Sequence, residues 1–119
     1  MATAKKRMIN KEFLENDRFY DLPIKTQYLY IHLILNADDD GFVGSPKKVA
    51  REISCGDREL KELLDNRFIL DFKDSNVIVV KAFLLHNNVR KDMYRPTVHQ
   101  EELKRLTLNK NGLYTEKNS

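Results

Sequence analysis

The sequence of 119 residues is poor in several residue types that mark special classes of protein. It has 1 Cys, 4 Gly and 3 Pro, and it has no Trp. The single thiol, Cys55, cannot close a disulfide within the chain, and such cysteine usage is typical of a reducing compartment. So few Gly and Pro exclude collagen-like and low-complexity structure. We therefore expect the fold to be stabilised by side-chain packing alone.

Long apolar runs are missing as well. No stretch approaches the roughly 18 consecutive apolar residues that a membrane-spanning helix needs. The basic cluster Lys5–Arg7 near the start is not followed by the apolar stretch of a signal peptide. We therefore expect a cytoplasmic protein without a membrane partner.

The charges that are present are unevenly spread. Lys and Arg number 21 against 18 Asp and Glu, which gives a formal net charge of +3. Residues 1–37 contain 6 basic and 4 acidic side chains and residues 86–119 contain 7 and 4, whereas residues 38–85 contain 8 and 10. Both ends are thus basic, which permits a nucleic-acid partner without requiring one.

Three helices are predicted in the first part of the chain. Leu22-Pro23 begins a helix that runs to about Ala37, because proline suits the first helical turn. Apolar residues surround this helix, so we expect it to be covered on more than one side. Ser45-Pro46 begins a second helix, Lys47–Ser54, and a third helix, Arg58–Asn66, follows after a turn that contains glycine. Two short helices joined in this way are typical of a helix-turn-helix.

The hydrophobic period changes after the third helix. Phe68, Leu70 and Phe72 recur at alternate positions, and residues 77–85 are almost continuously apolar. Both segments favour strands, and Lys73–Asn76 between them favours a turn. The order of three helices and a hairpin predicts an α+β fold, a winged helix-turn-helix with a three-helix core and a β-hairpin wing.

The predicted winged-helix domain covers residues 21–86, and the rest of the chain flanks it. Residues 1–20 form an N-terminal extension, with a short element near Lys11–Asn16 whose type the sequence does not decide. Residues 87–108 are predicted to be a basic connector and an extra C-terminal helix that packs on the domain. Thr97 and Gln100 fit a capping box at the start of that helix, which should end near Leu106. The polar residues 109–119 predict a flexible tail.

The residue patterns do not indicate catalysis. The sequence has no Gly-rich phosphate loop, no zinc-type pair of Cys, and no nucleophile beside a base at a recognised spacing. We therefore expect neither an enzyme nor a cofactor. His32 lies within the predicted buried helix and is expected to be a hydrogen-bonded core residue. His86 and His99 lie at element edges, without a cysteine or carboxylate at ligand spacing.

The acidic run Asp38–Gly41 partly matches a calcium-binding loop. Asn36, Asp38, Asp40 and Gly41 occupy positions 1, 3, 5 and 6 of an EF-hand pattern. The twelfth position, where a bidentate Glu should complete the cage, is Lys47, and its charge would repel the metal. We therefore predict no metal site and interpret the acidic run as a solvated end of the preceding helix.

Candidate DNA contacts begin with the third helix, because the second helix of a helix-turn-helix normally enters the major groove. Its outward polar residues are predicted to be Arg58, Lys61, Glu62, Asp65 and Asn66, of which Arg58, Lys61 and Asn66 are assigned to DNA contact. Residues 57–67 hold 3 basic and 4 acidic side chains, which is a poor match to phosphates. Cationic support is expected from Lys47, Lys48 and Arg51 on the second helix and from Lys73 and Lys81 on the hairpin. Each of these is explained equally well as a solubilising surface charge.

The connector Asn87–Thr97 is the most distinctive segment. It carries three cations and one aromatic residue without a helical or strand period, and its predicted DNA contacts are Arg90, Lys91, Tyr94 and Arg95. Such a segment can follow a phosphate backbone and offer its aromatic ring for stacking. The alternative is a connector whose Met93 and Tyr94 dock onto the body of the domain.

Several motifs in order and at matching spacing carry a family resemblance. They are Lys5–Ile9, Leu22-Pro23, Gln27–Leu33, Ala37–Val43, Pro46–Lys48, Arg67–Ile69, His86-Asn87, Arg90–Asp92 and Tyr94–Val98. With them the sequence resembles the N-terminal winged-helix domain of phage replisome organiser or replication initiation proteins, often described as DnaD-like. The resemblance implies binding of double-stranded origin DNA in the bacterial host cytoplasm and help in recruiting the host helicase or its loader.

Three functions stay open at this point. The domain could bind duplex origin DNA, chiefly through phosphates, or it could be a transcription regulator that needs a dimer on two-fold half-sites. It could also be a protein-interaction module that binds a replication or regulatory partner and has little affinity for DNA. The sequence does not decide whether the chain forms a homo-oligomer.

Overall fold

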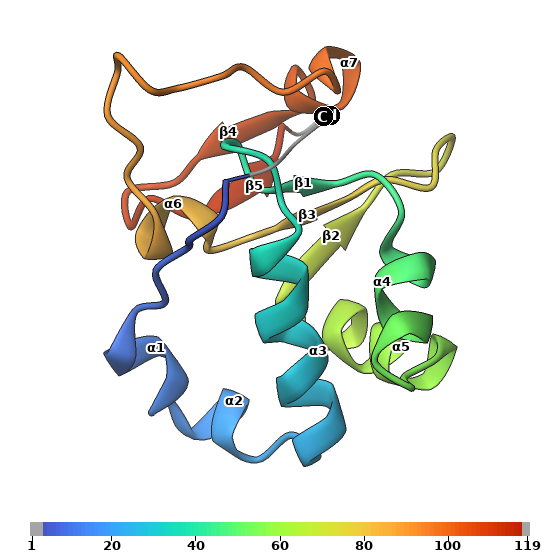
Figure 1. Cartoon of the computed structure of the whole chain (residues 1–119). Helices are drawn as coiled ribbons and strands as arrows, with labels where there is room; N and C mark the ends of the chain where they lie inside the picture. The colour runs from blue at the N-terminus through green and yellow to red at the C-terminus, as the bar shows by residue number, and fades with distance from the viewer. Residues whose placement is uncertain (1–3, 118–119) are drawn as a thin grey trace.

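The central helix of the structure is α3 (Ile24–Leu35), seen in Figure 1 in a computed structural model that describes residues 4–117. Pro23 precedes its first turn, as predicted. The residues buried along the helix are Thr26, Leu29, Tyr30, Leu33 and Ile34. We expected α3 to be covered by other elements on more than one side, but Ile24, Tyr28 and Leu35 are exposed to solvent. These three share one face at helical spacing, so α3 presents an apolar stripe to solvent.

The predicted pair of short helices is present. They are α4 (Pro46–Glu52), which begins with its proline, and α5 (Asp57–Asp65). In the turn between them Ser54 has φ 62°, a left-handed conformation that reverses the chain. The carboxylate of Glu59 accepts a 2.8 Å hydrogen bond from the backbone N–H of Gly56, which fixes the start of α5. Local sequence therefore specified both helices and the turn.

A three-stranded antiparallel sheet lies beside these helices, in the order β1-β3-β2. Its strands are β1 (Phe42–Val43), β2 (Ile69–Asp71) and β3 (Ile78–Val80). Because successive side chains of a strand point to opposite faces, one face packs toward α3 and α5 and the other faces away from them. The fold is thus α+β, with helices on one side of a small sheet.

The second strand of the hairpin is shorter than predicted. Residues 77–85 were expected to form a strand, but β3 ends at Val80 and α6 (Phe83–His86) follows. A short apolar run fits a buried strand and a buried helix equally well, so its periodicity could not decide. The helical turn packs Phe83 against Gly41, which has φ +94°. A Cβ atom at Gly41 would lie 2.6 Å from the Cβ of Phe83, so this close approach requires glycine.

The opening element near Lys11–Asn16 is helical. It consists of α1 (Lys11–Leu14), and α2 (Asp17–Tyr20) follows it directly. Asn10 and Asn16 cap these helices through side-chain oxygens that accept backbone N–H groups. The ring of Phe13 stacks 5.4 Å from that of Tyr30, so this N-terminal region packs on α3.

The C-terminal part differs most from expectation. The extra helix, α7 (Gln100–Leu103), is a single turn, and a second hairpin follows, made of β4 (Leu106–Leu108) and β5 (Tyr114–Glu116). The predicted flexible tail at 109–119 is therefore wrong for its described residues, while residues 118–119 lie outside them. The hairpin forms because Leu106 and Tyr114 are buried against the outer face of the first sheet.

The helices are all short, with α3 the longest of those named above. Within residues 4–117, no helix has the length and apolar character needed to cross a bilayer.

Candidate nucleic-acid interface

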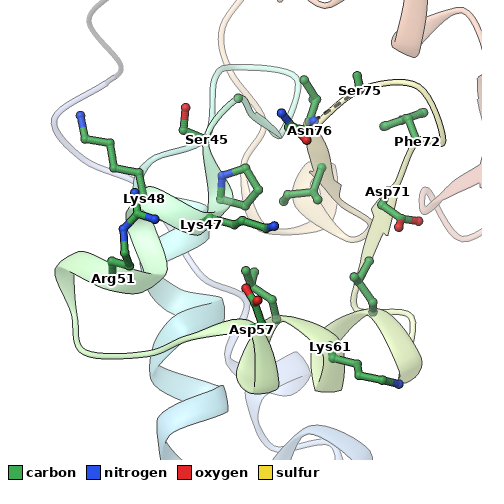
Figure 2. A pocket seen from close by; sticks show the side chains of 16 residues that line it. Ser45, Lys47, Lys48, Arg51, Asp57, Lys61, Asp71, Phe72, Ser75 and Asn76 are labelled. Carbon is green, nitrogen blue, oxygen red and sulfur yellow. Dashed lines mark hydrogen bonds between the residues drawn. The ribbon is translucent and has the colours of Figure 1, made fainter.

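A hollow of about 650 Å³ lies between α4, α5 and the β2–β3 turn (Figure 2). Four of the predicted DNA contacts line it, namely Lys47, Lys48, Arg51 and Lys61. Its lining also includes the apolar residues Leu60, Leu64, Phe72, Val77 and Ile78. The structure thus gathers cations from both α4 and α5 around one concave surface.

Helix α4 aims its cations outward because its apolar residues face the core. Val49 and Ala50 are buried, whereas Lys47, Lys48 and Arg51 are exposed. In Figure 2, the side chain of Lys47 extends over the hollow, and Lys48 and Arg51 project from the same helix. In the part of the chain that the structure describes, none of the three forms a salt bridge. Their charge is therefore available to a ligand.

The acidic residues of α5 differ in the contacts that they make within the fold. Glu59 accepts the hydrogen bond from Gly56, which lowers the pKa of Glu59, and Glu62 accepts a hydrogen bond from the hydroxyl of Thr26 on α3. The prediction that Glu62 points outward is therefore wrong. Asp65 pairs with Lys61 at 2.8 Å, and Asp57 lines the hollow. Both hydrogen-bonded carboxylates keep their negative charge, so the acidic bias of α5 remains and the cations of α4 must outweigh it.

The remaining candidates on α5, Arg58 and Asn66, differ in whether their side chains have partners within the fold. Arg58 is exposed and forms no salt bridge among residues 4–117. Asn66 ends the helix: its amide donates to the carbonyl of Glu62 at 2.8 Å, and its own carbonyl accepts from Arg18. The structure therefore uses Asn66 as a helix cap rather than as a free polar group.

The hairpin contributes other residues than those predicted. Lys73 is exposed near the turn, and Lys81 follows β3, but neither lines the hollow. Burial, together with the nearby cations Arg67 and Arg18, lowers the pKa of Lys81. Ser75 and Asn76 line the hollow instead. These neutral residues give no charge signal in the sequence, although their turn-forming character was a usable signal.

The acidic run at the end of α3 is not solvated, so that prediction is wrong. Asp40 is only 8% exposed and accepts hydrogen bonds from the hydroxyl of Tyr94 at 2.7 Å and from the N–H of Thr97 at 2.8 Å. Asp38 accepts the N–H groups of Asp40 and Phe42, each at 3.0 Å. The carboxylates therefore hold the connector in place through hydrogen bonds.

This arrangement fixes part of the predicted basic connector. Partial burial and the hydrogen bonds to Asp40 raise the pKa of Tyr94 to about 12. The docking alternative therefore holds for Tyr94 and fails for Met93, which is 65% exposed. Arg90 pairs with Asp92 at 2.7 Å, while Lys91 and Arg95 are exposed. Figure 1 shows the connector at the upper left and α4 and α5 at the right, so the predicted contacts fall into separate groups.

The buried histidine is His86, whereas the sequence predicted His32. His86 is buried: its Nδ1 accepts the N–H of Asn10 at 2.9 Å, and its Nε2 lies 2.9 Å from the hydroxyl of Tyr30. Burial lowers the pKa of His86 to about 4. His32 is half-buried, with its ring 4.4 Å from that of Tyr28. The sequence placed His32 within the buried helix and His86 at the edge of an element, so the burial of His86 was not predicted.

No group of three His, Cys, Asp or Glu side chains among residues 4–117 is arranged to hold a metal ion. Comparisons of the chain with protein-family models, with curated proteins and with solved structures found no match.

Proposed function

We propose that this chain is a winged-helix domain that binds double-stranded DNA through the face formed by α4, α5 and the β2–β3 hairpin. One observation carries the proposal: Lys47, Lys48 and Arg51 are exposed and unpaired among the described residues, beside a hollow that α5 also lines. Unpaired cations on a concave surface favour the phosphate backbone of nucleic acid.

The order and pairing of the elements support the winged-helix assignment. Three helices, α3, α4 and α5, are followed by the β2–β3 hairpin, and β1 between α3 and α4 adds the third strand. In such an arrangement α5 takes the place of the recognition helix and the hairpin that of the wing.

The composition of the surface favours contacts with phosphates over contacts with base edges. On its hollow side α5 offers Asp57, Leu60, Lys61 and Leu64, and none of these is an Arg, Asn or Gln able to pair with a base in bidentate fashion. Arg58 lies outside the set that lines the hollow. Affinity would therefore depend mainly on salt, with a modest preference for sequence.

The resemblance described above supports a role in starting phage DNA replication, with origin DNA as ligand and the host helicase or its loader as partner. A transcription regulator on the same fold would instead require two chains on two-fold half-sites. Stoichiometry on DNA therefore separates these roles.

The test is fluorescence anisotropy of a labelled duplex from the neighbourhood of the gene and of a scrambled duplex, from about 50 to 200 mM salt. The variant Lys47→Ala/Lys48→Ala/Arg51→Ala should flatten the plot of log affinity against log salt by up to about 2.7, at about 0.9 for each phosphate that is no longer neutralised. A control of equal charge, Lys11→Ala/Lys104→Ala/Lys110→Ala, should leave the slope within about 0.5 of the original.

Equal flattening by both triple variants would show a general effect of net charge and would contradict the proposed face. Absence of DNA binding at about 50 mM salt would contradict the function itself. A stoichiometry of two chains on a palindromic duplex would favour the regulator.

A further inference from the structure

Another hollow, of about 830 Å³, lies between the N-terminal segment 4–8 and the connector. Its volume is within the usual range of ligand-binding pockets. It shares no lining residue with the hollow beside α4 and α5. Any ligand here would therefore be bound independently of the proposed DNA interface.

The walls of this hollow carry exposed apolar side chains. Met8 is 69% exposed and Met93 is 65% exposed, and Val89 and Pro96 line the same surface. Exposed apolar side chains that gather at one place mark interaction sites more often than scattered ones do. Methionine is flexible and polarizable, which suits it to adaptable binding of apolar groups.

Cations outnumber carboxylates around the hollow, with Lys5, Lys6, Arg7 and Arg95 against Asp38 and Asp39. Lys5, Lys6 and Arg95 line it and are exposed, and within residues 4–117 none of them forms a salt bridge. Asp38 and Asp39 also line it and keep their negative charge, but their oxygens accept hydrogen bonds from within the fold. Asp39 pairs with Arg7 at 2.9 Å and accepts the N–H of Arg95, and Asp38 accepts the hydrogen bonds described above.

The N-terminal wall is held firmly in place. The side chain of Arg7 is 3% exposed, donates to the carbonyl of Ala37 at 2.9 Å and lies over the ring of Phe83 at 5.2 Å. The amide of Asn87 accepts the N–H of Met8 at 2.7 Å and donates to its carbonyl at 3.0 Å. A preformed wall lowers the entropy cost of binding a ligand.

We propose that this hollow binds a peptide segment of a partner protein in which carboxylates alternate with aliphatic or aromatic side chains. The carboxylates would pair with Lys5, Lys6 and Arg95, and the apolar side chains would pack on Met8 and Met93. Nucleic acid fits less well, because phosphates and sugars gain little from exposed thioethers. The proposal does not depend on DNA binding at α4.

The test begins by selecting binders from a displayed library of random 12-residue peptides on the immobilised full chain. Selected peptides should be enriched in Asp and Glu next to Leu, Ile or Phe. Methyl-¹³C labelling of methionine supplies a local readout, since the sequence has 3 Met and two of them, Met8 and Met93, line the hollow. Both signals should shift on addition of the selected peptide.

Two variants of equal charge change separate the site from the net charge. Lys5→Glu/Lys6→Glu/Arg95→Glu should weaken peptide binding at least about tenfold, because three attractive contacts become repulsive. Lys11→Glu/Lys104→Glu/Lys110→Glu changes the charge equally at exposed sites outside the hollow and should change the peptide affinity less than about threefold.

Three results would overturn the proposal. The selected peptides could lack acidic residues, or they could bind without shifting the signals of Met8 and Met93. A DNA duplex could shift both signals and displace the peptide, which would assign the hollow to nucleic acid. Failure of DNA binding at α4 would leave these readouts unchanged, so the two proposals fail separately.

Discussion

Two short runs of like charge lie close together in the sequence, and the fold uses them in opposite ways. The three carboxylates of Asp38–Asp40 are occupied by hydrogen bonds from the connector, from the backbone and from Arg7. The cations of α4, namely Lys47, Lys48 and Arg51, form no salt bridge among the residues that the structure describes. Their side chains are exposed beside a hollow.

This difference separates charge that holds the structure from charge that is available for binding. A buried carboxylate stabilises the fold when donors surround it, and removing it leaves those donors unsatisfied. An exposed, unpaired cation contributes little to stability, so its replacement should affect binding far more than folding. Measurements of unfolding free energy can therefore test the comparison directly.

The largest expected loss comes from the glycine beside the acidic run. Gly41→Ala should lower the free energy of unfolding by at least about 3 kcal/mol, through a strained left-handed backbone and overpacking against Phe83. Chemical denaturation measures this change. Gly56→Ala is the matched control, because a Cβ there would meet no atom within 4 Å. Similar losses for both variants would contradict the role of the close contact.

Removal of a carboxylate from the acidic run should cost somewhat less. Asp40→Ala leaves the Tyr94 hydroxyl and the Thr97 N–H without their acceptor, and we expect a loss of about 2–3 kcal/mol. Asp92→Ala, at an exposed pair in the connector, should cost less than about 1 kcal/mol. DNA affinity of Asp40→Ala, measured where the variant is folded, should match that of the original chain. A strong fall in DNA affinity would contradict the separation of structural carboxylates from cations available for binding.

Acid should lower the free energy of unfolding through His86, another buried group that supports the fold. Its folded pKa of about 4 lies below the ordinary 6.5, so the unfolded chain binds the proton more readily between these values. Stability should therefore fall as the pH drops from 6.5 toward 4, by up to about 3 kcal/mol at about 1.4 kcal/mol per pKa unit. His86→Gln should remove that part of the pH dependence, and His32→Gln should keep it. Denaturation curves across this pH range compare the three proteins.

The smallest effect on stability belongs to α4. Lys47→Ala, Lys48→Ala and Arg51→Ala should each change the free energy of unfolding by less than about 0.5 kcal/mol. The same denaturation assay measures it, alongside the weaker DNA binding expected for the triple variant. A loss above about 1 kcal/mol at any of these sites would show that the cation supports the fold.

Local signals were sufficient to predict the elements that form the proposed DNA-binding face. Prolines, caps and helical spacing within a few residues specified α3, α4 and α5, and alternation specified β2. They also placed Lys47, Lys48 and Arg51 on the outer face of α4, because Val49 and Ala50 had to face the core. The finding that these cations are unpaired needed the whole structure.

The role of the acidic run could not be predicted from local sequence. The partners of Asp40 are Tyr94 and Thr97, more than fifty residues away, and no spacing rule links them. The second hairpin was missed for a similar reason, since Leu106 and Tyr114 gain their burial from Phe42 and Val79. The many polar residues of 109–119 led to the prediction of a flexible tail. Long-range packing therefore decided each element that local patterns misassigned.

The hydroxyl of Tyr114 donates to the backbone carbonyl of Asp40 at 2.7 Å, across 74 positions of the chain. During synthesis, the acidic run leaves the ribosome long before Tyr94, Thr97 or this tyrosine has been added. At that stage Asp38 and Asp39 already have local backbone N–H groups and Arg7 as donors, whereas Asp40 still lacks the Tyr94 hydroxyl and the Thr97 N–H; the elements from α1 to β3 can pack without them. The nascent chain should therefore fold in two stages, with the surface of α4 and α5 formed first and the hydrogen bonds of the acidic run completed last.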